Sequence, residues 1–143
     1  MHLQTTTDYG IRVMCYLYDK DRLITATELS EKLGISYPYL IRVLGRLRQT
    51  GMIEVARGRF GGYRITKSAR DSSLYDIIKT MEGEIWINFC LNKDGDCTRN
   101  AIDTCPVHKI LESAQEQLIA SLDRVRLSDI ASISWNGRTV AVQ

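Results

Sequence analysis

Three cysteines in one stretch of the chain have the residue type and the spacing of a metal site. Cys90, Cys97 and Cys105 follow the pattern C-x6-C-x7-C, and His108 comes next as C-x2-H. Thiolates are soft ligands that suit zinc or an iron-sulfur cluster. Structural zinc sites usually take cysteines in pairs roughly two to four residues apart, and no pair here is that close. The spacing therefore favours a cluster, with a Cys3His zinc site or metal-free reactive thiols as the alternatives.

A four-coordinate cofactor needs one ligand more than three thiolates supply. His108 stands one helical turn beyond Cys105 and offers an imidazole; its alternative role is that of a polar residue at a helix start. Asp8 is remote in sequence, but it could reach the cluster loop of a partner subunit, and its alternative role is the N-cap of the first helix. The remaining cysteine, Cys15, falls on an apolar helix face and is expected in the core.

The cysteines lie in an irregular segment that precedes a long helical pattern. Residues 83–105 are rich in Asn, Asp and Gly and show no sustained hydrophobic period, as in a functional loop. Residues 106–130 begin with Pro106 and carry one apolar stripe: Val107, Ile110, Leu111, Ala114, Leu118, Leu122 and Val125. The stripe is longer than a small domain covers, so we predict a dimerisation helix; a helix packed wholly on its own domain is the alternative. The tail, residues 131–143, has no clear assignment.

Residues 1–82 have the order of elements of a winged helix-turn-helix. Helical spacing begins near Asp8, and a second helix opens at Thr25, which forms a capping-box pattern with Glu28. A third helix starts at Ser36, and two short strands, residues 53–56 and 63–66, then flank a glycine-containing loop. A short helix, a turn, a basic helix and a basic hairpin in this order predict a recognition helix followed by a wing.

Basic residues concentrate in this part of the chain. Between Ser36 and Arg70 eight basic residues stand against one acid, Glu54, although the net charge of the whole chain is only +2. Such a segment can neutralise DNA phosphates and release their counterions, whereas the alternative is a solvated basic face. The candidate DNA-contacting residues lie at the helix starts, on the recognition helix and in the wing: Thr25, Ser36, Tyr37, Pro38, Tyr39, Arg42, Arg46, Arg48, Arg57, Gly58, Arg59, Gly61, Gly62 and Tyr63.

The bulk composition limits the fold and the class of protein. With 143 residues, 44% of them hydrophobic, the chain can form one core with a projecting element. We predict a mainly α fold with a small β-hairpin, a winged helix-turn-helix with a long C-terminal dimerisation helix. The sequence shows neither a signal-peptide pattern nor an apolar run of roughly 20 residues, which predicts a cytoplasmic protein without a membrane partner. No catalytic constellation stands out, so an enzyme is not expected.

Nearly the whole chain resembles the Rrf2 family of winged-helix transcription regulators. The resemblance rests on the segments TDYGIRVM, ISYPYLIRVLGRLRQTGMI, RGRFGGYRI, DIIKTMEG and the three-cysteine loop. It points to the iron-sulfur branch of the family, which includes nitric-oxide sensors and regulators of cluster assembly. The resemblance implies that Cys90, Cys97 and Cys105 ligate the cluster and that residues 36–48 and 57–63 contact DNA.

The resemblance also gives each candidate fourth ligand a precedent. Asp8 resembles the aspartate that the nitric-oxide sensors supply across the dimer to a four-iron cluster, and His108 resembles the histidine that the assembly regulators use on a two-iron cluster. The N-terminal match favours the four-iron cluster. The cysteine spacing is wider than usual in the family, and Ile41 stands where the assembly regulators have an acidic base-reading residue.

Together these features predict a cluster-dependent transcription regulator, most simply a repressor, that senses nitric oxide or redox and cluster status. A homodimer would place two recognition helices on the half-sites of a pseudo-palindromic operator in double-stranded DNA. One alternative is an iron-sulfur assembly regulator with a two-iron cluster. Another, from a different class, is a small redox or electron-transfer protein, against which the concentration of basic residues argues.

Overall fold

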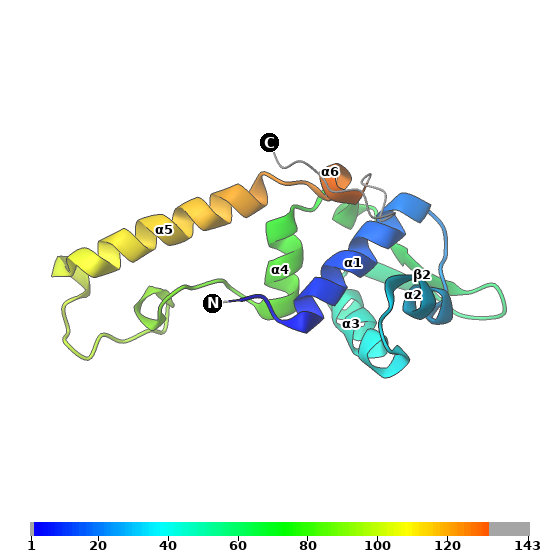
Figure 1. The fold of residues 1–143 in the computed structure, drawn as a ribbon, viewed down its shortest axis with the longest axis horizontal. Coiled ribbons are helices and arrows are strands. Elements are labelled where there is room, and N and C mark those ends of the chain that lie inside the picture. Colours follow the sequence, from blue (N-terminus) through cyan, green and yellow to red (C-terminus); the bar gives the residue numbers. More distant parts are fainter. Residues whose placement is uncertain (1, 132–143) are drawn as a thin grey trace.

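The computed structural model describes residues 2–131 and consists of a packed unit and a projecting arm (Figure 1). The packed unit contains five helices and a hairpin: α1 (Thr5–Lys20), α2 (Ala26–Leu33), α3 (Tyr37–Gln49), β1 (Ile53–Ala56), β2 (Gly62–Ile65), α4 (Leu74–Glu82) and α6 (Leu127–Ala131). The arm is the loop that follows α4 together with α5 (Pro106–Asp123). Short 3₁₀ turns cover Ser68–Asp71, Phe89–Leu91 and Ile102–Thr104. The predicted fold class, mainly helical with one hairpin, is confirmed.

The first helix begins earlier than the sequence suggests. Its N-cap is Gln4, so Asp8 lies in the first turn and the prediction of Asp8 as N-cap is wrong. The Gln4 side chain makes no capping bond; instead the Glu82 carboxylate accepts hydrogen bonds from the Gln4 backbone N–H (2.8 Å) and the Thr7 hydroxyl (2.7 Å). A residue from the end of α4 therefore caps α1, a long-range contact that no local pattern could indicate.

The second helix begins at the predicted cap but forms only half of the expected capping box. The Thr25 hydroxyl accepts from the Glu28 N–H at 3.1 Å. The Glu28 carboxylate turns away and accepts hydrogen bonds from Arg22 and Tyr16. The complete capping box is at the start of α4, on Ser73 and Asp76.

The core is formed by one face of each helix in the packed unit. α1 contacts α2, α3, α4, α6 and β2, and its Val13, Met14 and Leu17 are fully buried. Leu44 and Ile77 bring α3 and α4 into the same cluster. Cys15 is 1% exposed and belongs to this core, as predicted.

The hairpin is held to the helices by backbone hydrogen bonds. β1 and β2 are antiparallel with Ile53 opposite Ile65, and β2 begins one residue before the predicted strand. Tyr63 exchanges two backbone hydrogen bonds with Ile24, at 2.9 and 2.8 Å, so the segment before α2 extends the sheet by one bridge. Gly62 lies at this contact, where an added Cβ would be 2.8 Å from the Ile24 backbone.

The long helix ends at Asp123, short of residue 130, because the chain turns back onto the packed unit. The Leu74 N–H donates to the Val125 carbonyl (2.8 Å) and the Leu127 N–H donates to the Ser72 carbonyl (2.9 Å). These bonds place α6 against α1, where Leu127 and Ala131 are buried. None of the described helices has the length and apolar character needed to span a membrane.

Candidate DNA-binding surface and cysteine site

The third helix presents a polar and aromatic face outward. Its inner face is buried through Leu40, Val43, Leu44 and Leu47. All seven predicted contact residues on α3 and its N-cap are exposed: Ser36, Tyr37, Pro38, Tyr39, Arg42, Arg46 and Arg48. The fold therefore leaves all seven of these side chains accessible.

Aromatic contacts connect this face of α3 to the first helix. The Tyr39 ring packs edge-on against Tyr9, with ring centroids 6.2 Å apart. The Arg42 guanidinium lies 6.0 Å from the Tyr39 ring centroid, and Arg12 lies 5.6 Å from that of Tyr9. Cation–π contacts at this distance favour defined side-chain positions without neutralising the charge. Arg42 is thus oriented and remains available to a phosphate.

The eight basic residues of this region divide by the partners that they have. Arg64 pairs with Glu54, and Arg70 pairs with Asp21 at 2.8 Å. Arg46 donates through Nε to the Thr80 carbonyl at 3.0 Å, which ties α3 to α4. The remaining five basic residues of the region have no carboxylate partner within residues 2–131: Arg42, Arg48, Arg57, Arg59 and Lys67. The unpaired cations lie on α3, in the wing and just after it.

Thr25 and Tyr63, which are predicted to contact DNA, also stabilise the fold. The Thr25 hydroxyl caps α2, and Tyr63 packs against the core while its backbone bridges to Ile24. The wing loop also contains an aromatic side chain that is not among the predicted contact residues: Phe60, at the tip, is 86% exposed. Its position between Arg59 and a glycine pair was the available signal.

The start of α5 brings two of the loop cysteines and His108 together. Cys105 is the N-cap of α5, and its Sγ accepts from the His108 N–H at 3.5 Å. The His108 Nδ1 is 3.3 Å from the Cys90 Sγ. The His108 imidazole therefore contacts the Cys90 thiol, while the His108 backbone contacts the Cys105 thiol. The start of α5 lies at the far end of the arm from α2 and α3 (Figure 1).

The chain around Cys90 is held by local contacts and by α5. Cys90 lies in the 3₁₀ turn Phe89–Leu91, and Asn88 Nδ2 donates to its Sγ at 3.4 Å. The Ile87 N–H donates to the side-chain oxygen of Gln115 on α5 at 2.9 Å. These contacts place Cys90 beside the first turn of α5.

Cys97 lies in a separate turn of the loop. Backbone N–H groups of Ala101, Arg99 and Asn100 donate to its Sγ and hold the pKa of the Cys97 thiol below its ordinary value. Hydrogen bonds of this kind stabilise the thiolate, the form that binds metal. Within the described residues no group of three or more His, Cys, Asp and Glu side chains is arranged to hold a single metal ion. The donor types suit an iron-sulfur cluster, although the loop does not bring all three thiols together by itself.

Asp8 lies apart from the cysteines of its own chain. Its carboxylate pairs with Arg12, one turn along α1, at 2.6 Å. Cys15 is also separate, and burial raises the pKa of its thiol to about 12, so it stays protonated at neutral pH. Of the predicted metal ligands, the structure therefore places His108 in contact with Cys90 and with Cys105, and leaves Cys97 and Asp8 elsewhere.

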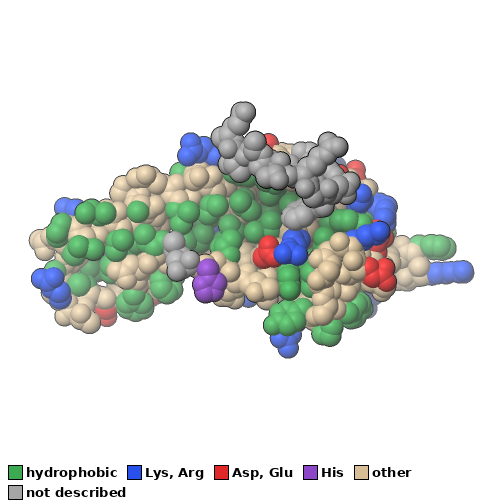
Figure 2. Space-filling view, in the orientation of Figure 1, with side chains coloured by type: hydrophobic (Ala, Val, Ile, Leu, Met, Phe, Trp, Pro, Cys, Tyr) green, Lys and Arg blue, Asp and Glu red, His purple; other side chains and the backbone are tan. Residues whose placement is uncertain are grey.

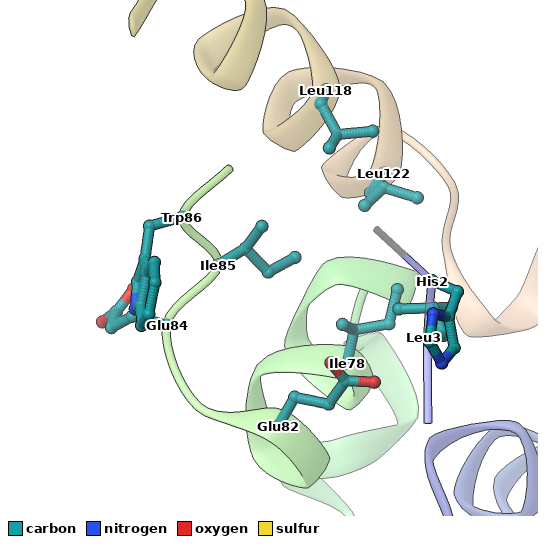
Figure 3. Close-up of a pocket in the computed structure, with 9 residues that line it drawn as sticks. All are labelled: His2, Leu3, Ile78, Glu82, Glu84, Ile85, Trp86, Leu118 and Leu122. Carbon is teal, nitrogen blue, oxygen red and sulfur yellow. The ribbon is translucent and has the colours of Figure 1, made fainter. Parts of the chain in front are cut away.

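A cavity of about 420 Å³ lies where the arm meets the packed unit (Figure 3). Leu118 and Leu122 of α5 face Ile78 of α4 across the opening, with Ile85 from the segment after α4 at one side. The lining is mainly apolar: His2, Leu3, Ile78, Glu82, Glu84, Ile85, Trp86, Leu118 and Leu122. No cysteine lines it, so it is distinct from the cysteine site.

Comparisons with known proteins agree on one family. Residues 3–133 match the family model Rrf2, described as iron-dependent transcriptional regulator. The chain is 29% identical to the HTH-type transcriptional regulator NsrR of Halalkalibacterium halodurans, covering 91% of this chain and 90% of that protein. It is also 29% identical to the HTH-type transcriptional repressor NsrR of Streptomyces coelicolor, covering 92% and 89%.

Solved structures of the same fold include two regulators with different names. The T. potens IscR structure has a TM-score of 0.72 and 22% identity, covering 99% of this chain and 94% of that chain. The structure of CymR, described as the global cysteine regulator of B. subtilis, has a TM-score of 0.68 and 25% identity, covering 92% and 97%. The same fold therefore occurs both in the protein named IscR and in the protein named CymR.

Proposed function

Because the chain belongs to the Rrf2 family of transcription regulators, and is not an enzyme, we propose that an iron-sulfur cluster controls how it binds DNA. Cys90, Cys97 and Cys105 would hold the cluster. The observation that carries this proposal is the pair of contacts at the start of α5, from His108 Nδ1 to the Cys90 thiol and from the His108 N–H to the Cys105 thiol, with the hydrogen-bonded Cys97 in the same loop. When bound, the cluster supplies a group that oxidants or nitric oxide can modify.

The coupling to DNA follows from how the arm is attached. The loop leaves α4 directly after Glu82, whose carboxylate caps α1, and α1 contacts α3 through Tyr9 and Tyr39. Bringing three thiols onto one cofactor requires the loop to adopt a single arrangement. A loop ordered in this way would bias the positions of α4 and α1 and, through them, the recognition helix. Cluster and DNA then favour each other's binding, as linkage requires.

A homodimer would cover the exposed apolar side chains of the arm. α5 extends over 18 residues without a single buried side chain, and Val107 and Ile110 are 57% and 67% exposed. Figure 2 shows hydrophobic side chains along the arm and over its junction with the packed unit. An apolar stripe this long is stable when a second helix covers it. A second copy of the chain would also place two recognition helices on the half-sites of a pseudo-palindromic operator, where the regulator acts as a repressor.

The contact between His108 and Cys90 favours a second candidate for the cluster. A four-iron cluster with Asp8 of the partner subunit as fourth ligand is what the N-terminal resemblance implies, and a nitric-oxide sensor would use it. The 3.3 Å approach of His108 Nδ1 to Cys90 Sγ instead supports a two-iron cluster with a histidine ligand. The signal would then be cluster status rather than nitric oxide.

Anaerobic purification of the full chain is the experiment that tests the proposal. We expect a visible absorption spectrum, with equal amounts of iron and acid-labile sulfide and no zinc. Duplexes selected from a random pool should bind the cluster-loaded protein, and removal of iron with a chelator should weaken the binding. A Cys97→Ser variant, purified in parallel, is the matched control.

Three results would contradict parts of this proposal. Stoichiometric zinc without sulfide would replace the cluster with a structural metal site. If DNA affinity is unchanged after the cluster is removed, the chain is still a DNA-binding regulator, but the cluster does not control its binding. The homodimer is tested by light scattering after size-exclusion chromatography, where a monomer at micromolar concentration would refute it.

A further inference from the structure

The tip of the wing presents a bare aromatic ring. Phe60 is 86% exposed, a larger fraction than any other of the exposed large hydrophobic side chains among residues 2–131. The ring belongs to neither the buried core nor its partly buried margin. The ring therefore adds no packing to the fold, and nearly all of its apolar surface is accessible to a partner.

The backbone holds this ring in a defined position. The Gly61 N–H donates to the Gly58 carbonyl at 3.0 Å and closes the turn, in which Gly58 has φ of 106°. A Cβ on Gly61 would lie 2.1 Å from the Ala56 carbonyl oxygen, so only glycine fits there. The turn is therefore compact, and the base of the hairpin is fixed by the bridge between β2 and Ile24.

A cation lies beside the ring, and a second one is close to it in sequence. The Arg59 guanidinium lies 5.7 Å from the Phe60 ring centroid, and neither Arg57 nor Arg59 has a carboxylate partner in the described part of the chain. In Figure 2 the tip of the hairpin carries hydrophobic and Lys or Arg side chains at the outermost point of the packed unit. An exposed apolar ring with an arginine beside it complements a groove that has anionic rims and an apolar interior. The minor groove of duplex DNA has this character, with phosphates at its edges and sugars and bases within.

We propose that Phe60 is a minor-groove wedge: its ring enters the minor groove that the wing contacts and unstacks one base-pair step there. This inference rests on the DNA binding proposed above and adds a residue and a mode of contact to it. Arg57 and Arg59 would bind the flanking phosphates, while Phe60 itself makes no charged contact. Pyrimidine–purine steps unstack most easily, so the wedge would favour a TA or CA step at the wing position of the operator.

The test uses the full-length, cluster-loaded protein and a duplex selected from a random pool by the wild type. Affinity is measured by fluorescence anisotropy at several salt concentrations. Bending is measured by energy transfer between the duplex ends, and unstacking by permanganate oxidation of thymines. Phe60→Ala removes the wedge, Phe60→Leu retains an apolar side chain, and Arg59→Ala removes a charge.

We expect Phe60→Ala to bind about tenfold more weakly and to lose both the bend and the thymine reactivity at the wing step. Its salt dependence should equal that of the wild type, whereas Arg59→Ala should lower the slope by about one. Phe60→Leu should retain most of the bend. Because the ring is exposed, all three variants should melt at the wild-type temperature.

The possible outcomes distinguish a failure of the wedge proposal from a failure of the proposed DNA binding. Wild-type affinity, bend and thymine reactivity in Phe60→Ala would overturn the wedge while leaving DNA binding in place. A wild-type protein that selects no duplex at all would overturn both. A loss of affinity in Phe60→Ala without any loss of bending or thymine reactivity would also refute the wedge, because the ring would then make only a surface contact.

Discussion

The packed unit and the arm differ in where their side chains are buried. Val13, Leu29, Leu44 and Ile77 of the packed unit are inaccessible or nearly so, and the unit forms one continuous core. Between residues 83 and 126 no side chain is buried, although this segment contains α5, the longest helix described. The fold of the DNA-binding part thus follows from its own packing, whereas the arm buries none of its side chains within the single chain.

This difference explains why the two ends of the molecule are suited to different tasks. A packed unit presents a recognition helix and a wing in fixed positions, which DNA recognition requires. A segment with few buried contacts has low local stability, and anything that binds its ordered form will stabilise it. The arm is therefore the part whose arrangement a cofactor or a second subunit can control.

The largest expected effect is on the packed unit. Leu44→Ala removes a side chain that is 1% exposed from α3, and we expect the free energy of unfolding to fall by about 2–5 kcal/mol. Urea unfolding of the apo protein, followed by circular dichroism, measures it. Lys93→Ala, on the exposed loop, is the control and should change stability by less than about 0.5 kcal/mol. Equal effects of the two changes would contradict the contrast between unit and arm.

Loss of a loop cysteine should weaken cofactor and DNA binding without changing the stability of the packed unit. Cys97→Ser should abolish the cluster and weaken operator binding by about 100-fold, because the binding-competent arrangement loses its cofactor. Iron and sulfide analysis and anisotropy measure the two effects. The unfolding free energy of the apo protein should stay at the wild-type value, since Cys97 is outside the core.

Cys15→Ala is the matched control for that cysteine. Its thiol has a pKa raised to about 12 by burial, so at neutral pH it is protonated and offers no thiolate. The variant should retain wild-type iron content while losing some stability. Loss of the cluster in Cys15→Ala, with the fold intact, would contradict the assignment of ligands to the loop.

The fourth ligand should have a smaller but separable effect. His108→Ala removes the imidazole beside Cys90, and we expect an altered visible spectrum and cluster affinity lower by about 10–100-fold. Asp8→Asn distinguishes the two candidate clusters. An unaltered spectrum in the Asp8→Asn variant would identify His108 as the fourth ligand. A loss of iron from the Asp8→Asn variant would identify Asp8 of the partner subunit as the fourth ligand.

The smallest expected effect is at the junction of the two regions. Glu82→Ala leaves the Gln4 N–H and the buried Thr7 hydroxyl without their acceptor, and we expect the free energy of unfolding to fall by about 1 kcal/mol. Glu82→Gln retains an acceptor oxygen and should lose less. Thermal unfolding of the two variants measures the difference. If the two variants unfold alike, Glu82 does not act as the cap of α1.

Several features could be predicted from the sequence because they depend on neighbouring residues. Thr25 caps α2, Pro106 opens α5 and Cys15 is buried, since capping, φ restriction and hydrophobic periodicity operate within a few turns. The start of α1 was predicted wrongly because its cap, Glu82, comes from the other end of the unit. The end of α5 was misplaced because Leu127 docks on a distant helix.

The sequence by itself determined the residue types of the cysteine site and the concentration of basic residues in the helix-turn-helix and wing. Only the tertiary structure decided which of these residues meet. It placed His108 beside Cys90, left Cys97 in a separate turn, and paired Asp8 with Arg12. It also neutralised Arg64 and Arg70 while leaving Arg42, Arg57 and Arg59 unpaired. Contacts between residues far apart in the chain depend on how the helices pack, and local patterns carry no information about that packing.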